Sequence, residues 1–277
     1  MPASDGYQSD IASGQSMSGQ SENPINGMFR NLVDGYLKVI DREIRFAFHP
    51  VVSDSTEGVT GFEALVRGDG AISADPLSSR ISPSDRFAFD QACRVLAIRA
   101  ARRFEIDGNL HLNCTDVTSH NAELVCMVTR TMAERHGIDR SRVVLEFSNL
   151  GAMGSLEELQ AICQVFRAYQ FQILHDNFGR DGGDPERLEH FRPDWIKFDR
   201  SLIENIQDQE AHQARLREYL ELCRGLHIQP MAAGIERAEE LEWLRTQGVV
   251  HFQGYYFTPP ELEPQEVYRP GQTLDQD

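Results

Sequence analysis

The chain has 277 residues, a formal net charge of −16 and a sequence pI near 5.0. This charge excludes a protein that binds nucleic acid polymers or an anionic bilayer by general electrostatic attraction, because both are polyanions. The chain starts without the apolar core of a signal peptide and contains no apolar run of about 18 residues, so we expect a cytoplasmic protein that does not bind membranes.

The cysteines indicate a reducing compartment. There are five, which is an odd number, they are widely spaced, and no C-x-x-C pair occurs: Cys93, Cys114, Cys126, Cys163 and Cys223. Each lies in a periodic segment rather than in a loop. We therefore predict buried free thiols and no disulfide framework.

Composition divides the chain into three parts. Residues 1–24 are rich in Ser, Gly, Gln and Asp and are predicted to be a disordered tail, and residues 266–277 form a C-terminal tail. Residues 25–265 are predicted to form one domain. This domain begins with an apolar stripe at helical spacing over 26–40, which either covers one end of the domain or binds a partner.

After this stripe, short apolar strands alternate with amphipathic helices. The predicted strands span 44–52, 61–68, 109–115, 142–150, 171–179, 194–200, 228–235 and 251–257, and the predicted helices span 84–104, 119–135, 155–169, 185–190, 207–224 and 237–247. Ser155 with Glu158 forms a capping box, and Gly137, Gly225 and Gly248 are predicted just past helix ends. The pattern predicts an α/β fold, a modified TIM-type (β/α)8 barrel with an N-terminal helix, whose sites lie at the carboxyl ends of strands.

Strand parity places polar groups where plain barrel cores carry Val, Ile or Leu. These groups are Glu63, Arg67, His111, Asn113, Glu146, Ser148, Asp176, Lys197, Asp199, His251 and Gln253. Taken singly, each has a structural interpretation, such as Asp176 as a helix cap, Lys197 as the partner of Asp199, and Glu236 as an acid at a helix start. Together, several carboxylates at one barrel mouth would repel one another without a divalent cation, and such oxygen ligands suit Mg²⁺ or Mn²⁺.

These residues resemble the EAL-domain phosphodiesterases of bacterial cyclic di-GMP signalling. The motif that gives that family its name is present as Glu63, Ala64 and Leu65, and it continues to Arg67. The resemblance extends from about residue 46 to residue 260, in order and with similar spacing.

The resemblance implies a barrel that binds cyclic di-GMP across its mouth, with two divalent ions that activate a water for in-line attack. By position, Glu63, Asn113, Glu146 and Asp176 are similar to the metal ligands of the family. Lys197 resembles the residue that steadies the attacking water, and Glu236 and Gln253 resemble supporting groups. The implied ligand contacts are Leu65 on a guanine, Arg67 on a phosphate, and His49, Asn113, Gln253 and Tyr255.

Several positions depart from the family pattern. Asn177 follows Asp176 where the family has a second aspartate, and Ala233 replaces the glutamate that acts on the metals and the nucleophilic water. Asn149 replaces another acid, His49 stands where a glutamine is usual, and RDGGD (residues 180–184) replaces a small, hydroxyl-rich loop. Lys197 and Glu236 would then be vestigial catalytic residues, with Mg²⁺ or Mn²⁺ bound weakly or not at all.

Three hypotheses remain open. In the first, a catalytically degenerate barrel captures cyclic di-GMP and reports it to a protein partner as a receptor or signalling adapter. In the second, the chain is an adapter that no longer binds nucleotide. In the third, it is a weak metal-dependent phosphodiesterase. A protein partner is expected for the first two, and the sequence is compatible with a homodimer.

Overall fold

The computed structural model describes residues 24–40, 43–56, 58–68, 81–148, 154–180 and 183–262. The two predicted tails lie outside these ranges, apart from Pro24, which begins a helix. Among the described residues, none of the helices has both the length and the apolar character needed to cross a membrane.

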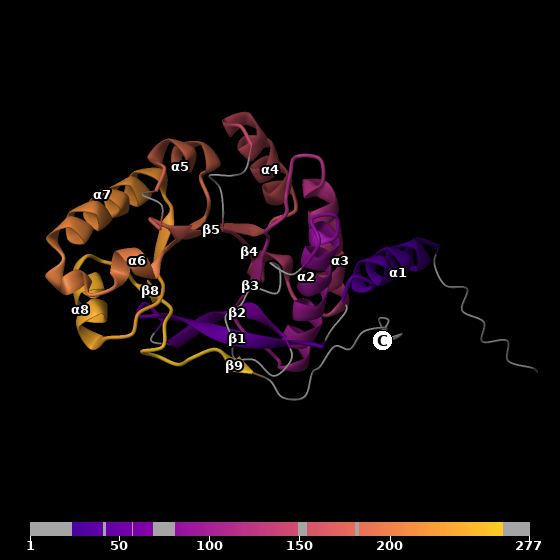
Figure 1. Ribbon diagram of the computed structural model, residues 1–277, viewed down its shortest axis with the longest axis horizontal. Coiled ribbons are helices and arrows are strands. Elements are labelled where there is room, and N and C mark those ends of the chain that lie inside the picture. Colours follow the sequence, from indigo (N-terminus) through magenta and orange to yellow (C-terminus); the bar gives the residue numbers. More distant parts are fainter. Residues whose placement is uncertain are drawn as a thin grey trace, which may run out of the picture.

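Eight strands close into a barrel, as predicted (Figure 1). They are β1 (Ile44–Ser53), β2 (Gly58–Gly68), β3 (Asn109–Asn113), β4 (Val143–Phe147), β5 (Gln172–Phe178), β6 (Trp195–Phe198), β7 (Gln229–Ala232) and β8 (His251–Phe252). Strands β2 to β8 pair in parallel, whereas β1 is antiparallel to both β2 and β8. A short strand, β9 (Glu261–Leu262), adds to the outside of β1. The barrel therefore differs from a plain (β/α)8 barrel in its one reversed strand.

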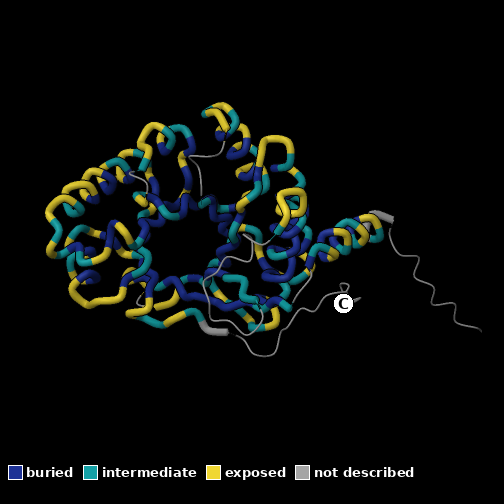
Figure 2. The backbone as a smooth tube through the Cα atoms, in the orientation of Figure 1, coloured by how far each residue is buried: buried dark blue, intermediate teal, exposed yellow. Residues whose placement is uncertain are grey.

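Helices surround the barrel, and their buried faces point toward the strands (Figure 2). They are α1 (Pro24–Leu37), α2 (Arg86–Arg103), α3 (Ala122–Arg135), α4 (Leu156–Ala168), α5 (Pro185–Phe191), α6 (Arg200–Ile203), α7 (Glu210–Leu226) and α8 (Ala238–Thr246). The stripe predicted over 26–40 covers the domain: Phe29, Val33, Tyr36 and Leu37 are buried in the same apolar cluster as α2 and α3.

The barrel interior consists of an apolar layer below a polar one. Val51, Val144, Leu174, Trp195 and Met231 form a separate buried cluster inside the barrel. Because side chains alternate along a strand, the residue two positions nearer the mouth shares the same face. Those residues are His49, Glu146, Asp176, Lys197 and Ala233, so the packed lower layer positions the site residues above it.

Helix boundaries follow local chemistry, with one correction. The Ser155 hydroxyl accepts a hydrogen bond from the Glu158 amide at 3.3 Å and caps α4, as predicted. Gly137 and Gly248 take positive φ just after α3 and α8. Gly225, predicted to lie past a helix end, is instead inside α7, and His227 takes the left-handed position with φ of 58°. The helix therefore ends two residues later than predicted, and the residue just past it is His227 instead of Gly225.

Candidate functional site

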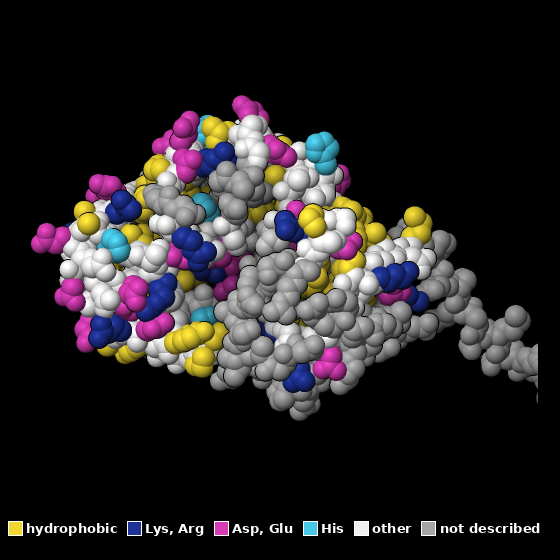
Figure 3. Space-filling model, viewed as in Figure 1, with side chains coloured by type: hydrophobic (Ala, Val, Ile, Leu, Met, Phe, Trp, Pro, Cys, Tyr) yellow, Lys and Arg dark blue, Asp and Glu magenta, His cyan; other side chains and the backbone are white. Residues whose placement is uncertain are grey.

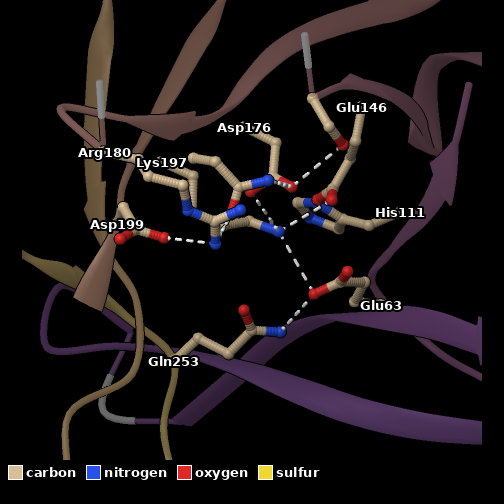
Figure 4. Close-up of polar contacts among 10 residues, drawn as sticks. Glu63, His111, Glu146, Asp176, Arg180, Lys197, Asp199 and Gln253 are labelled. Carbon is tan, nitrogen blue, oxygen red and sulfur yellow. Dashed lines mark hydrogen bonds and ion pairs between the residues drawn. The ribbon is translucent and has the colours of Figure 1, made fainter. Parts of the chain in front are cut away.

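Lys197 lies at the centre of the barrel mouth, among three carboxylates (Figure 4). Its Nζ is 2.7 Å from Glu146 Oε2, 3.1 Å from Glu63 Oε2 and 3.4 Å from Asp176 Oδ1. These four side chains come from β6, β4, β2 and β5 and are all buried. The alternative interpretation of Lys197, as the partner of Asp199, is therefore wrong, because Lys197 points inward to the other acids.

Two further side chains, His111 and Gln253, complete this arrangement. His111 Nδ1 lies 2.8 Å from Glu146 Oε1, and Gln253 Nε2 donates to Glu63 Oε2 at 2.9 Å. We name the set of Glu63, His111, Glu146, Asp176, Lys197 and Gln253 the Lys197 network. Every member has a partner of opposite charge or matching hydrogen-bonding capacity, as buried polar groups require.

The charges in the Lys197 network set its protonation. Burial acts to raise the pKa of Glu146, but Lys197 and His111 more than offset it and bring that pKa to about 2. Burial acts to lower the pKa of Lys197, and the three carboxylates hold it well above its usual value. Both groups are therefore charged at neutral pH. Burial raises the pKa of Asp176 to about 6; Lys197 opposes this rise, and Glu146 and Glu63 add to it.

A bulge in β5 turns Asp176 and Asn177 toward each other. The pairing of β5 with β6 shifts register between His175 and Phe178, and Asn177 has a φ of 56°. Bulges of this kind re-aim side chains beside functional sites. As a result, Asn177 Nδ2 donates to Asp176 Oδ2 at 2.8 Å, and the Ser148 hydroxyl reaches the same oxygen at 3.3 Å.

Asn177 also contacts Arg180, which lies across the edge of the site (Figure 4). Arg180 Nη2 donates to Asn177 Oδ1 at 3.0 Å and to Asp199 Oδ2 at 2.7 Å. Asp199 Oδ1 accepts from the Ser201 amide at 2.9 Å, which fixes the start of α6. We name Asn177, Arg180 and Asp199 the Arg180 rim.

A cavity of about 210 Å³ lies between the Lys197 network and the Arg180 rim. The side chains that line it are Glu63, Asp176, Asn177, Lys197, Phe198, Asp199, Arg200, Ala233, Gly234 and Gln253. Its volume is roughly that of seven water molecules, at about 30 Å³ per water, so a phosphate group fits within it. The wall at Ala233 presents only a methyl group.

The far wall is closed by Arg200. Its guanidinium bonds the Gly234 carbonyl and forms ion pairs with Glu236 at 3.0 Å and Glu204 at 3.2 Å. Gly234 has a φ of 75°, and a Cβ there would lie 2.6 Å from Arg200 Cβ, so glycine is required. Glu236 is half exposed and turned toward Arg200, away from the Lys197 network. It lies in a supporting position and is not at the centre of the site.

The predicted ligand contacts lie along β1 and β2 at the same mouth. His49 faces Glu63 across these strands, and Leu65 faces Ala47. His49 is buried, which lowers its pKa, and its Nε2 has no hydrogen-bond partner within the described ranges. Its ring lies 6.0 Å from that of exposed Tyr255. Arg67 is half-buried, which lowers its pKa, and donates through Nη1 to the Val66 carbonyl.

Asn113 is held at the end of β3 by a buried pair. It lies in register with Glu146, and its carbonyl accepts a hydrogen bond from Arg94 Nη1 at 3.0 Å. Arg94 is buried and paired with Asp90, whose other oxygen accepts from the Thr115 amide and hydroxyl. The structure thus brings Asn113 to the mouth and ties its backbone to α2.

Three of the four predicted metal ligands, Glu63, Glu146 and Asp176, converge on Lys197, which pairs with an oxygen of each. Both oxygens of Glu146 are taken by Lys197 and His111, and Glu63 Oε2 is shared by Lys197 and Gln253. Across the described ranges, no three His, Cys, Asp or Glu side chains are arranged to hold a metal ion. As arranged, the donor set does not fit a divalent ion, because an ammonium group occupies its centre.

Sequence reasoning missed three contributors to this site. His111 was placed on the interior face but given no role, and its partnership with Glu146 depends on the alignment of β3 with β4. The sequence marks Arg180 only as the start of an altered loop and Asp199 only as a possible partner of Lys197, so their contact with each other is not anticipated. Asn149 and residues 181–182 lie outside the described residues. All five cysteines are free, and four of them are buried, as predicted.

Around the mouth, basic and acidic side chains gather near the centre of the face seen along the barrel (Figure 3). A family model described as "EAL domain" matches residues 36–260 of the chain. Among curated proteins, the chain is similar to the blue light- and temperature-regulated antirepressor BluF of Escherichia coli K12, with 26% identity over 219 residues. That match covers 78% of this chain and 54% of BluF, so the chain spans about half the length of that relative.

Solved structures of the same shape include nucleotide complexes. A standalone versatile EAL protein from Vibrio cholerae O395, in its c-di-GMP bound form, matches with 31% identity and a TM-score of 0.74, over 82% of this chain and 98% of that chain. The manganese/cy-diGMP complex of Klebsiella pneumoniae BlrP1 matches with 24% identity and a TM-score of 0.70, over 79% of this chain and 56% of that chain. At this lower identity, the second match supports the fold alone.

Proposed function

The chain belongs to the EAL-domain family, and we propose that it is a catalytically degenerate member that binds cyclic di-GMP and acts as a receptor or signalling adapter. The observation that carries this proposal is the composition of the cavity wall. Asn177 and Ala233 stand where the family pattern places acids, and Lys197 holds the remaining carboxylates together.

The missing acids bear on the chemistry. A neutral amide is a weaker ligand than a carboxylate for a hard cation, and a methyl group neither coordinates a cation nor accepts a proton. Losing a general base typically lowers a rate about a hundred- to ten-thousand-fold. We therefore infer that the residues around the cavity do not hydrolyse a phosphodiester at a useful rate.

Ligand binding requires fewer functional groups at the mouth than hydrolysis does. The mouth keeps Leu65 and Arg67 on β2 and the exposed ring of Tyr255, so a surface for a base and a cation for a phosphate remain. The standalone Vibrio protein, which is 31% identical, was solved with c-di-GMP bound. Cyclic di-GMP is the ligand class that this family resemblance supports best.

An adapter role has its own support in the similarity to BluF, which is named as an antirepressor. A protein that regulates by contact does not need turnover. We also infer that the chain works in the cytoplasm, since its five thiols are free. A receptor or adapter of this kind would act on a protein partner.

Calorimetric titration of the purified chain with cyclic di-GMP, in Mg²⁺ and in EDTA, tests the proposal, with analysis of the same samples for linear product. Binding without product supports the receptor. Absence of heat up to high micromolar ligand in both buffers would leave the nucleotide-free adapter, and linear product in Mg²⁺ or Mn²⁺ would establish a residual phosphodiesterase instead.

A further inference from the structure

Asn177 is suited to join a carboxylate to a guanidinium. Its amide donates through Nδ2 to Asp176 and accepts through Oδ1 from Arg180. An aspartate at this position has no donor, so it would set a second carboxylate against Asp176. Asparagine is also one of the few residues that tolerate the left-handed backbone found here, with φ of 56°.

Arg180 has hydrogen-bonding capacity left over. Both of its hydrogen bonds use Nη2, and its side chain is 57% exposed. An arginine carries five N–H donors in a planar fork. The donors on Nε and Nη1 thus have no partner in the part of the chain that the structure describes, and the guanidinium is held in place by Asn177 and Asp199.

The other two cations beside the cavity are already committed. Lys197 is surrounded by Glu63, Glu146 and Asp176, and Arg200 is bonded to Gly234, Glu204 and Glu236. The carboxylates that line the cavity would repel a phosphate unless a cation faced it. On the β5–β6 side of the mouth, Arg180 is the described side chain able to supply that charge.

We propose that Arg180, oriented by Asn177 and Asp199, binds a phosphodiester group of the ligand at this cavity and supplies there the positive charge that a divalent cation would otherwise provide. The inference rests on the proposed binding of cyclic di-GMP and deepens it. Guanidinium groups bind phosphate through two parallel N–H bonds, which a held and partly exposed arginine offers. Binding is therefore independent of divalent ions and dependent on residue 180.

Calorimetry in EDTA with cyclic di-GMP tests this proposal on the full chain. The wild type is expected to bind, Arg180→Ala to bind about ten- to a hundredfold more weakly, and Arg180→Lys to recover only part of the affinity, because lysine keeps the charge without the fork. Arg215 is an exposed arginine of α7, and Arg215→Ala is the matched control, which is expected to leave the affinity unchanged. Asn177→Ala removes the hold on the guanidinium and is expected to weaken binding several-fold, independently of any folding defect at residue 180.

The outcomes separate the two proposals. Equal affinity of wild type and Arg180→Ala, or wild-type binding that appears only with Mg²⁺ or Mn²⁺, overturns the role of Arg180 and leaves the receptor function standing. Absence of wild-type binding in every buffer overturns both. Both proposals are supported if the wild type binds in EDTA, Arg180→Ala binds about ten- to a hundredfold more weakly or not at all, and Asn177→Ala binds several-fold more weakly.

Discussion

The Lys197 network and the Arg180 rim are built from the same kinds of groups but differ in how completely those groups are paired. In the network, side chains are nearly inaccessible and each charge has several partners. In the rim, the Arg180 side chain is 57% exposed, and its Nε and Nη1 donors have no partner among the described residues. Buried charges must be neutralised to be tolerated at all, whereas exposed ones can be held in place and still be available.

The comparison assigns different tasks to the two regions. In the network, Lys197 supplies positive charge to the three converging carboxylates. The rim and the β2 side of the mouth are the parts with capacity left for a ligand. In the function proposed above, the network keeps the shape of the mouth and the rim serves recognition.

The largest expected effect comes from returning acids to the cavity wall. Asn177→Asp combined with Ala233→Glu should raise formation of linear product from cyclic di-GMP in Mn²⁺ by about a hundred- to ten-thousand-fold over wild type, because a base and an anionic ligand are restored. Product is measured by chromatography. Asn177→Asp with Ala233→Gln is the matched control, which adds the bulk without the base. If the double variant still formed no linear product, the RDGGD segment would also disable the site.

Breaking the network from its centre should cost the most stability. Lys197→Met leaves three buried carboxylates without their cation and should lower the free energy of unfolding by about 3–5 kcal/mol in EDTA. Urea denaturation at pH 7 measures it, with exposed Lys38→Met as the control. Adding Glu146→Gln to Lys197→Met should recover part of the loss. If Lys197→Met proved as stable as wild type, the network would not be what supports the mouth.

Much of this comparison could be predicted from strand parity, and the rest depends on local backbone geometry. Alternation placed Glu63, Glu146 and Lys197 on one interior face, and the closed barrel brings them together. The bulge between His175 and Phe178 breaks that alternation, so the Asn177–Arg180 contact has no periodic signal. Lys197 and Asp199 do share parity, yet Asp199 caps α6 and pairs with Arg180, because a strand end offers a helix amide as an alternative partner.

On the ligand side of the comparison, Arg67→Ala should weaken cyclic di-GMP binding by about 1.5–3 kcal/mol, as expected for loss of a hydrogen bond to a charged group. Titration calorimetry in EDTA measures the change against Arg215→Ala. Arg67 and Arg180 lie on different sides of the mouth, so their effects should be nearly additive if each contacts its own part of the ligand. No change on substitution of Arg67 would move the ligand away from β2.

His175, on the opposite face of β5, is a buried ionisable group that contrasts with the paired charges of the Lys197 network. His175 is buried between β5 and the helices, against Phe178 and Phe191. Its Nδ1 has no hydrogen-bond partner in the part of the chain that the structure describes, and burial lowers its pKa to about 3. The unfolded chain titrates near the usual value of about 6.5. Between these two values the unfolded state binds a proton that the folded state does not, so stability falls as the pH drops from about 6.5 toward 3.

Replacing this histidine should therefore flatten the acid side of the stability curve. At pH 5 the wild type should have lost about 2 kcal/mol through this group, at about 1.4 kcal/mol per pH unit, and His175→Leu should not show that loss. Urea denaturation between pH 4 and 7 is the measurement, with exposed His120→Gln as the matched control. An unchanged slope in His175→Leu would mean that His175 is protonated in the folded chain, and the contrast between paired charges inside the barrel and an unpaired neutral group outside it would fail.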